Sequence, residues 1–192
     1  IMIVTPYYSK PSQHGILRHF EEISKITDLP IMAYNIPGRT STLIELETLQ
    51  TLVDDIGIHS IKDAVGDFEF SKKQLELLKD KVDIYSGNDN QTYDFVINGG
   101  VGVVSVASHV VGDEISEMIS FAKDNDLEKA EEINMQLSNL FEAIFEEPSP
   151  GPIKKILSES WEEVGEPLLP ITSITPELAN KIRGFYKKIK EN

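Results

Sequence analysis

Short apolar runs alternate along the chain with longer segments in which apolar residues recur every three or four positions. Nearly continuous apolar runs are typical of strands buried on both faces, and the wider spacing predicts amphipathic helices. The expected strands cover residues 1–6, 29–37, 57–64, 82–88 and 102–108. The expected helices between them cover residues 12–27, 42–53, 69–80 and 89–99. This alternation predicts an α/β protein with a parallel sheet covered by helices.

The pattern changes near Val110, where the strands end. Residues 113–145 form an amphipathic stretch that predicts a helix, residues 146–161 are interrupted by three prolines before helical spacing resumes, and residues 175–192 predict a closing helix. We therefore expect a partial barrel over residues 1–125 and a C-terminal helical region over residues 126–192. Within the first region, Thr42 is followed three positions later by Glu45, a capping box that predicts the start of a helix at residue 42.

The loops after the expected strands favour a barrel over an open doubly wound sheet. An open sheet usually carries a glycine-rich phosphate loop after its first strand, and the sequence has none. The strand ends instead carry reactive side chains, at Thr5-Pro6-Tyr7-Tyr8, Tyr34-Asn35, Lys62-Asp63, Ser86-Gly87-Asn88 and Ser105. In a (β/α)8 TIM barrel, chemistry collects at the C-terminal ends of the strands. Five strands do not close such a barrel, so we expect the C-terminal part of one, about strands 4 to 8. We also expect an upstream segment, because Ile1 already lies within an apolar run.

The amino-acid composition argues against several classes of partner and of metal site. The chain of 192 residues has a formal net charge of −14, which argues against a nucleic acid or an anionic membrane as partner. It contains no window of about 18 consecutive apolar residues of the kind that spans a membrane. The absence of cysteine excludes disulfides and thiolate metal sites, and fits a reducing cytoplasm.

Lys62 stands at the end of an apolar strand, in the stretch HSIKDAVGD. The simpler interpretation is a lysine just past the strand end that pairs with Asp63 or Asp67. The alternative is a nucleophile, since a lysine among apolar neighbours has a lowered pKa, and its free amine can attack a ketone to form an iminium.

The expected neighbouring strand end, AYNIPGRT, offers two groups that such chemistry needs. Tyr34 is a phenol that can relay protons, and Arg39 can hold a carboxylate through two parallel hydrogen bonds. Each also has a simpler interpretation: Tyr34 can be a tyrosine of the core, and Arg39 can form an ion pair on the surface. Their placement on neighbouring strand ends favours the functional interpretation.

Five motifs in order, TPYYSKPSQHG, AYNIPGRT, SIKDAVGD, YSGND and GGVGVVSVASH, closely resemble the dihydrodipicolinate synthase family. This family belongs to the class I pyruvate aldolases, which include N-acetylneuraminate lyase. The resemblance extends along the whole chain, as far as EEPSPGPIKK before the last helices.

The resemblance implies roles that the residues alone do not give. Lys62 matches the lysine that forms a Schiff base with pyruvate, Tyr34 the tyrosine that donates and accepts protons, and Tyr8 a relay tyrosine that reaches a neighbouring subunit's site. Arg39 matches the arginine that binds the carboxylate of the aldehyde substrate. Val104 matches an aliphatic contact to pyruvate, and Tyr7 a residue of the lysine inhibitor site.

The reaction implied by the resemblance condenses pyruvate with aspartate 4-semialdehyde, on the path to diaminopimelate and lysine. It needs no metal and no organic cofactor, and the family's barrels assemble as homotetramers built from tight dimers. We expect a homo-oligomer, either a tetramer or a dimer. The family's Gly-Thr-Thr-x-Glu motif, whose threonines complete the proton relay and hold the carboxylate of pyruvate, is not among these residues.

Three hypotheses follow. The first is the C-terminal portion of a 4-hydroxy-tetrahydrodipicolinate synthase. The second is a sister aldolase that acts on sialic acid or a keto-deoxy sugar acid, which Arg39 disfavours because its role suits a short amino-acid aldehyde better than a polyol. The third is a non-catalytic fragment that folds by oligomerising through exposed strand edges.

Overall fold

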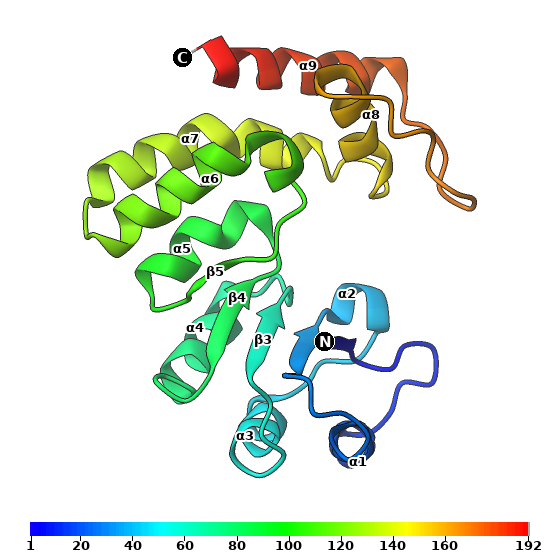
Figure 1. The fold of residues 1–192 in the computed structure, drawn as a ribbon, viewed down its shortest axis with the longest axis vertical. Coiled ribbons are helices and arrows are strands. Elements are labelled where there is room, and N and C mark those ends of the chain that lie inside the picture. The colour runs from blue at the N-terminus through cyan, green and yellow to red at the C-terminus, as the bar shows by residue number, and fades with distance from the viewer. Residues whose placement is uncertain (192) are drawn as a thin grey trace. The chain divides into compact units, whose positions relative to one another are not determined.

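The computed structural model describes residues 1–191, which divide into two compact units (Figure 1). The first unit is Ile1–Val104 and the second begins at Ser105. The predicted division after residue 125 follows a different criterion, because it counts the last barrel helix with the barrel. That division stays a prediction.

The first unit is a five-stranded parallel sheet with helices, and its strands are ordered as in the sequence, β1-β2-β3-β4-β5. The strands are β1 (Met2–Val4), β2 (Met32–Asn35), β3 (Ser60–Asp63), β4 (Asp83–Ser86) and β5 (Gly102–Val103). The helices are α1 (Gln13–Ser24), α2 (Pro37–Thr40), α3 (Leu46–Asp54), α4 (Phe68–Leu77), the 3-10 turn η1 (Asp89–Gln91) and α5 (Thr92–Ile97). Each strand pairs with the next one along the chain, as β3 and β4 do in Figure 1. The predicted fold class, α/β with part of a (β/α)8 barrel, is confirmed.

The core of this unit lies between the sheet and its helices. Ala33, Ile61 and Ile84 form one register row across three strands, and all three are buried. Phe20 of α1 and Phe95 of α5 belong to the same hydrophobic cluster. Because side chains alternate between the two faces of a strand, the next residue on each strand lies on the opposite face.

The predicted capping box at Thr42 is wrong. The helix begins four residues later, at Leu46, and no side chain caps it at Glu45. The intervening chain is held in a non-helical path, because the Asn35 side chain bonds to both the backbone N–H and the carbonyl of Ile44. The short helix α2, which opens with Pro37 at its first position, was not predicted either.

The fifth predicted strand is shorter than expected. Only Gly102–Val103 pairs with β4, and α6 already begins at Ser108. Ser105 assists the change, since its hydroxyl accepts a hydrogen bond from the backbone N–H of Ser108 at 2.8 Å. Apolar residues in this stretch therefore continue into a helix rather than a strand.

The second unit is helical. Its elements are α6 (Ser108–Lys123), α7 (Leu127–Ala143), α8 (Gly151–Ser160) and α9 (Pro176–Glu191). The single helix predicted over residues 113–145 is wrong, because the chain turns between α6 and α7. Asn125 has a positive φ of 61°, and Asp126 caps α7 by accepting a hydrogen bond from the N–H of Lys129. Asparagine tolerates the left-handed region and aspartate is a preferred N-cap, which explains a break inside an amphipathic pattern.

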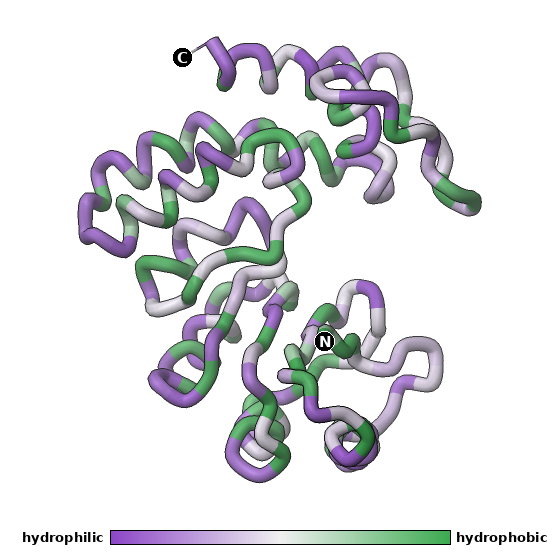
Figure 2. The backbone as a smooth tube through the Cα atoms, viewed as in Figure 1, coloured by the Kyte–Doolittle hydropathy of each residue, from purple (hydrophilic) through white to green (hydrophobic). Residues whose placement is uncertain are grey.

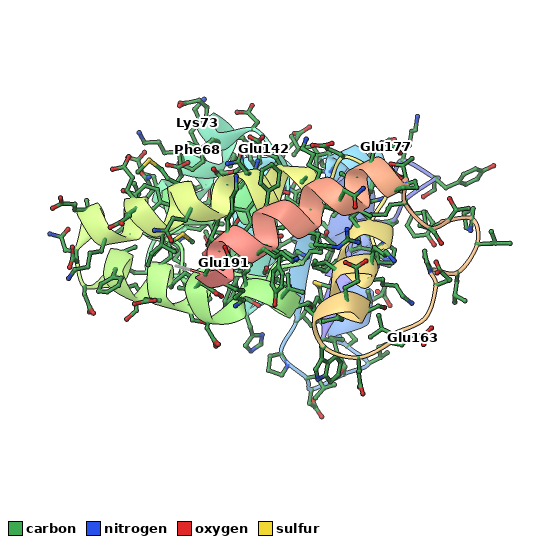
Figure 3. The ribbon with its side chains drawn as sticks, turned by 90° about the horizontal axis from the view of Figure 1, so that it is seen from above. Phe68, Lys73, Glu142, Glu163, Glu177 and Glu191 are labelled. Atoms are coloured by element: carbon green, nitrogen blue, oxygen red, sulfur yellow. The ribbon has the colours of Figure 1, made fainter. Side chains whose placement is uncertain are left out.

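Hydrophobic and hydrophilic residues alternate along α6 and α7 (Figure 2), which pack on one another through their apolar faces. Helix α9 packs against α7 and α8, and Figure 3 shows it running from Glu177 in its first turn to Glu191. Arg183 of α9 joins it to Glu159 of α8 through two parallel hydrogen bonds of 2.8 and 2.7 Å. Among residues 1–191, no helix is long and apolar enough to cross a membrane.

Candidate functional site

The candidate site lies at the C-terminal edge of the sheet in the first unit. Tyr34 of β2 and Lys62 of β3 are register partners, and the row continues to Tyr85 of β4. Tyr34 and Lys62 therefore lie side by side on one face of the sheet. This is the face opposite to the buried row that contains Ile61.

Lys62 is 9% exposed, and its amine lies over the Tyr34 ring, with Nζ 4.3 Å from the ring centroid. Burial lowers the pKa of Lys62 below its ordinary value, because removal from water penalises the charged form. The negative charge of Asp89 acts in the opposite direction and raises the pKa of Lys62. Desolvation is the larger effect, so the pKa of Lys62 is lowered overall.

The simpler interpretation of Lys62 is wrong on both points. The residue lies within β3 rather than past its end. Among the described residues, the Asp63 carboxylate bonds to Val65 and Gln74, and the Asp67 carboxylate caps α4. Neither aspartate forms the ion pair with Lys62 that the simpler interpretation requires.

Tyr34 is half-buried, and Arg39 is exposed on α2. Burial raises the pKa of Tyr34, and the nearby positive charge of Arg39 lowers it. The burial effect is the larger one, so the phenol keeps its proton at neutral pH and remains a donor. Arg39 is close enough to act on that phenol electrostatically.

The other residues singled out in the sequence lie on two further loops. Val104 directly follows β5, and its N–H donates to the carbonyl of Ser86 at 2.9 Å, which ties it to the end of β4. Tyr7 and Tyr8 lie on the loop after β1 and are 68% and 95% exposed. The structure therefore brings Lys62 and Tyr34 together and leaves the two loop tyrosines facing solvent.

Two residues at the site were not assigned a role from the sequence. Asp89 is 1% exposed in η1, and its charge acts on Lys62. Gly87 leaves room for the lysine stem, since a Cβ at this position would lie 3.0 Å from Cε of Lys62. The motif YSGND contains both residues, but only the strand pairing brings that motif beside Lys62.

A row of buried polar side chains lies one residue beyond the reactive row. Asn35, Asp63 and Ser86 are register partners at the ends of β2, β3 and β4, and none is more than 1% exposed. Within residues 1–191, no group of three or more histidine, aspartate or glutamate side chains gathers as metal ligands would.

Comparison with known proteins gives a consistent result. A family model described as the dihydrodipicolinate synthetase family matches residues 1–189. A 4-hydroxy-tetrahydrodipicolinate synthase from Listeria monocytogenes is 36% identical over 191 residues, which is 100% of this chain and 65% of the relative.

Two solved structures have similar folds. A dihydrodipicolinate synthase from Cyanidioschyzon merolae, with lysine bound, is 38% identical, with a TM-score of 0.94 over 98% of this chain and 64% of its own. A chloride-inhibited dihydrodipicolinate synthase from Acinetobacter baumannii, complexed with pyruvate, is 31% identical, with a TM-score of 0.94 over 98% and 65%. The chain thus spans about 65% of the length of the Listeria relative.

Proposed function

Because the chain belongs to the dihydrodipicolinate synthetase family, we propose that it forms the C-terminal part of a 4-hydroxy-tetrahydrodipicolinate synthase. The observation that carries this proposal is the Lys62 amine, which is buried at a strand end, lies over the Tyr34 ring and has a lowered pKa. A lowered pKa increases the fraction of free amine at a given pH, and the free amine is the nucleophile.

In the proposed reaction, Nζ of Lys62 attacks the ketone carbon of pyruvate, and the carbonyl oxygen leaves as water. The resulting iminium withdraws electrons from the neighbouring methyl carbon, which loses a proton to become an enamine. That carbon then forms a bond to the aldehyde carbon of aspartate 4-semialdehyde, whose oxygen takes up a proton to become a hydroxyl. The amine of the semialdehyde then attacks the re-formed iminium carbon, and Lys62 leaves as the free amine. No metal or organic cofactor is required, because the iminium itself is the electron sink.

The proposed roles of the other residues come from the family resemblance and are supported, for Tyr34, by its place beside Lys62. Tyr34 has a raised pKa and neighbours Lys62, so it can donate and accept the proton that water formation requires. Tyr8 continues the relay, and Val104 contacts pyruvate. Arg39, on the helix that follows the Tyr34 strand, binds the carboxylate of the semialdehyde.

Assembly is part of the proposal. Tyr8 is 95% exposed, so its ring is available for contact with a second copy of the chain. A tyrosine presented in this way is suited to enter the site of a second copy. We therefore propose a homo-oligomer, either a tetramer or a dimer. From the family resemblance we also propose a lysine inhibitor site that uses Tyr7, and a cytoplasmic location in diaminopimelate and lysine biosynthesis.

The first experiment is intact-mass analysis after incubation with pyruvate and borohydride, which reduces the iminium to a stable amine. We expect an adduct of pyruvate on the wild-type chain and none on Lys62→Ala. Lys73→Ala is the matched control, because Lys73 is an exposed lysine on α4 (Figure 3) and its loss leaves the adduct unchanged.

Further assays separate the three hypotheses. Condensation with aspartate 4-semialdehyde supports the synthase, while cleavage of sialic acid or a keto-deoxy sugar acid supports the sister aldolase. If no adduct forms, either on this chain or on the protein with an upstream segment added, the aldolase proposal fails. An adduct only on the longer protein would make this chain a non-catalytic part of an active enzyme.

A further inference from the structure

The buried polar row at the ends of β2, β3 and β4 does not contact the candidate substrate face, yet each member lies directly after a residue of the reactive row. Side chains alternate along a strand, so Asp63 points to the face opposite Lys62, as Asn35 does relative to Tyr34. A polar side chain is buried at little cost only when it is hydrogen-bonded. The partners of these side chains therefore indicate their role.

Each member of the row bonds to the loop that follows its own strand. Asn35 binds both the N–H and the carbonyl of Ile44 at 3.0 Å. Ser86 donates to the carbonyl of Asn88 at 2.8 Å and accepts from its N–H at 3.1 Å. Neither contact joins one strand to another, so both fix the local path of the chain beyond the strand.

Asp63 has the same arrangement and one addition. Its Oδ1 accepts the N–H of Val65 at 2.8 Å, and its Oδ2 accepts Nε2 of Gln74 on α4 at 3.1 Å. Its backbone carbonyl accepts the N–H of Gly87 at 2.6 Å. The residue after Lys62 is thus held to its own loop, to its own helix and to the next strand.

We propose that Asp63 is a positioning residue for Lys62, and that it acts by anchoring the end of β3 so that the amine stays beside Tyr34. Asn35 performs the corresponding task for the segment of residues 36–44, which carries Arg39. The segment that Asp63 anchors carries no reactive group, so the effect of Asp63 falls on Lys62. The kinetic part of this inference rests on the proposed function.

Anchoring predicts that shape matters at position 63 and that charge does not. Asparagine can still accept the N–H of Val65, and its amide can donate to Gln74. The Oε1 of Gln74 has no partner, and a turn of the Gln74 amide brings it to the place where Nε2 now donates, so that it accepts from the asparagine amide and the bond is kept. Asp63→Asn therefore preserves the anchor, while Asp63→Ala removes it.

The test compares Asp63→Ala, Asp63→Asn and Asn35→Ala with the wild-type chain. We expect Asp63→Ala to slow the trapping of pyruvate by borohydride by about 10- to 100-fold, since a displacement of about 1 Å has effects of this size. Asp63→Asn should trap within about twofold of wild type. Asn35→Ala should trap faster than Asp63→Ala and should raise KM for the semialdehyde about tenfold, because Arg39 is displaced.

Hydrogen exchange gives a readout that needs no activity. We expect Asp63→Ala to speed amide exchange in residues 62–67 and not in residues 36–44, and Asn35→Ala to do the reverse. If neither the wild-type chain nor the protein with an upstream segment added traps pyruvate, the proposed function alone is refuted, and exchange then decides the inference. Equal loss of trapping in Asp63→Asn and Asp63→Ala, or faster exchange in both segments for both alanine variants, would overturn the positioning role.

Discussion

Gly87 offers the sharpest test of how the site is packed. A Cβ at this position would lie 2.7 Å from Cβ of Ala64, 2.9 Å from the backbone carbonyl oxygen of Asp63 and 3.0 Å from Cε of Lys62. The first two neighbours cannot move away cheaply, since one is directly attached to the backbone and the other belongs to it. The lysine stem is the flexible neighbour, so Gly87→Ala both strains the end of β3 and displaces the nucleophile.

The expected magnitude follows from these contacts. Overpacking of a buried site lowers the free energy of unfolding by about 1–3 kcal/mol. In a chain of this size each kcal/mol lowers Tm by about 2–4 °C, so Gly87→Ala should melt about 2–12 °C below wild type. Displacement of the Lys62 amine should slow pyruvate trapping by up to about 100-fold.

Thermal melting and borohydride trapping, carried out on the same preparations, test both effects. Gly184→Ala is the control, because a Cβ there meets no atom within 4 Å and the residue lies inside α9. That change should stabilise the chain by about 0.5–1 kcal/mol, as alanine does relative to glycine in a helix. If Gly87→Ala melts and traps pyruvate like wild type, the close packing around Lys62 is refuted.

Three further predictions use the charged groups. Burial lowers the pKa of Lys62 in the folded chain below the 10.5 of the unfolded chain. Between these two pKa values the unfolded chain binds more protons, so the free energy of unfolding rises with pH. Lys62→Met should therefore raise Tm at pH 7, by an amount that shrinks toward pH 10.5. Burial raises the pKa of Asp63 in the folded chain above the 3.8 of the unfolded chain. Between these two pKa values the folded chain binds more protons, so the free energy of unfolding falls as pH rises. Asp63→Asn should therefore have a higher Tm than wild type at pH 7, and this difference should vanish below pH 3.8. Arg183→Met breaks the paired hydrogen bonds to Glu159 and should lower the free energy of unfolding slightly in denaturant titrations, with a smaller loss at high salt.

The order and type of most elements could be predicted from the amino-acid sequence. Apolar runs such as the one around Ile61 predict strands, because a strand that is buried on both faces needs apolar residues at nearly every position. The structure has all five predicted strands. The sequence also singled out Lys62, since a lysine at the end of an apolar strand is unusual. Proton relay by Tyr34 and carboxylate binding by Arg39 were suggested by their residue types, whereas the role of Tyr8 came from family resemblance. All three roles remain predictions.

Local signals failed where longer-range contacts overrode them. The helix does not begin at Thr42, because the Asn35 side chain, nine positions away from Ile44 in the sequence, bonds to the backbone of Ile44 and holds this segment out of the helix. The turn at Asn125 was not predicted, because the helical spacing of apolar residues continues on both sides of Asn125.

The groups that surround the Lys62 amine could be identified only from the folded chain. Register places the Tyr34 ring beneath it, and the close approach of β4 brings Gly87 against its stem. Burial, hydrogen bonding and pKa depend on distances between residues from different strands, and no local pattern carries those distances. Periodicity records which side of an element is buried, whereas the pairing of strands determines what each residue meets there.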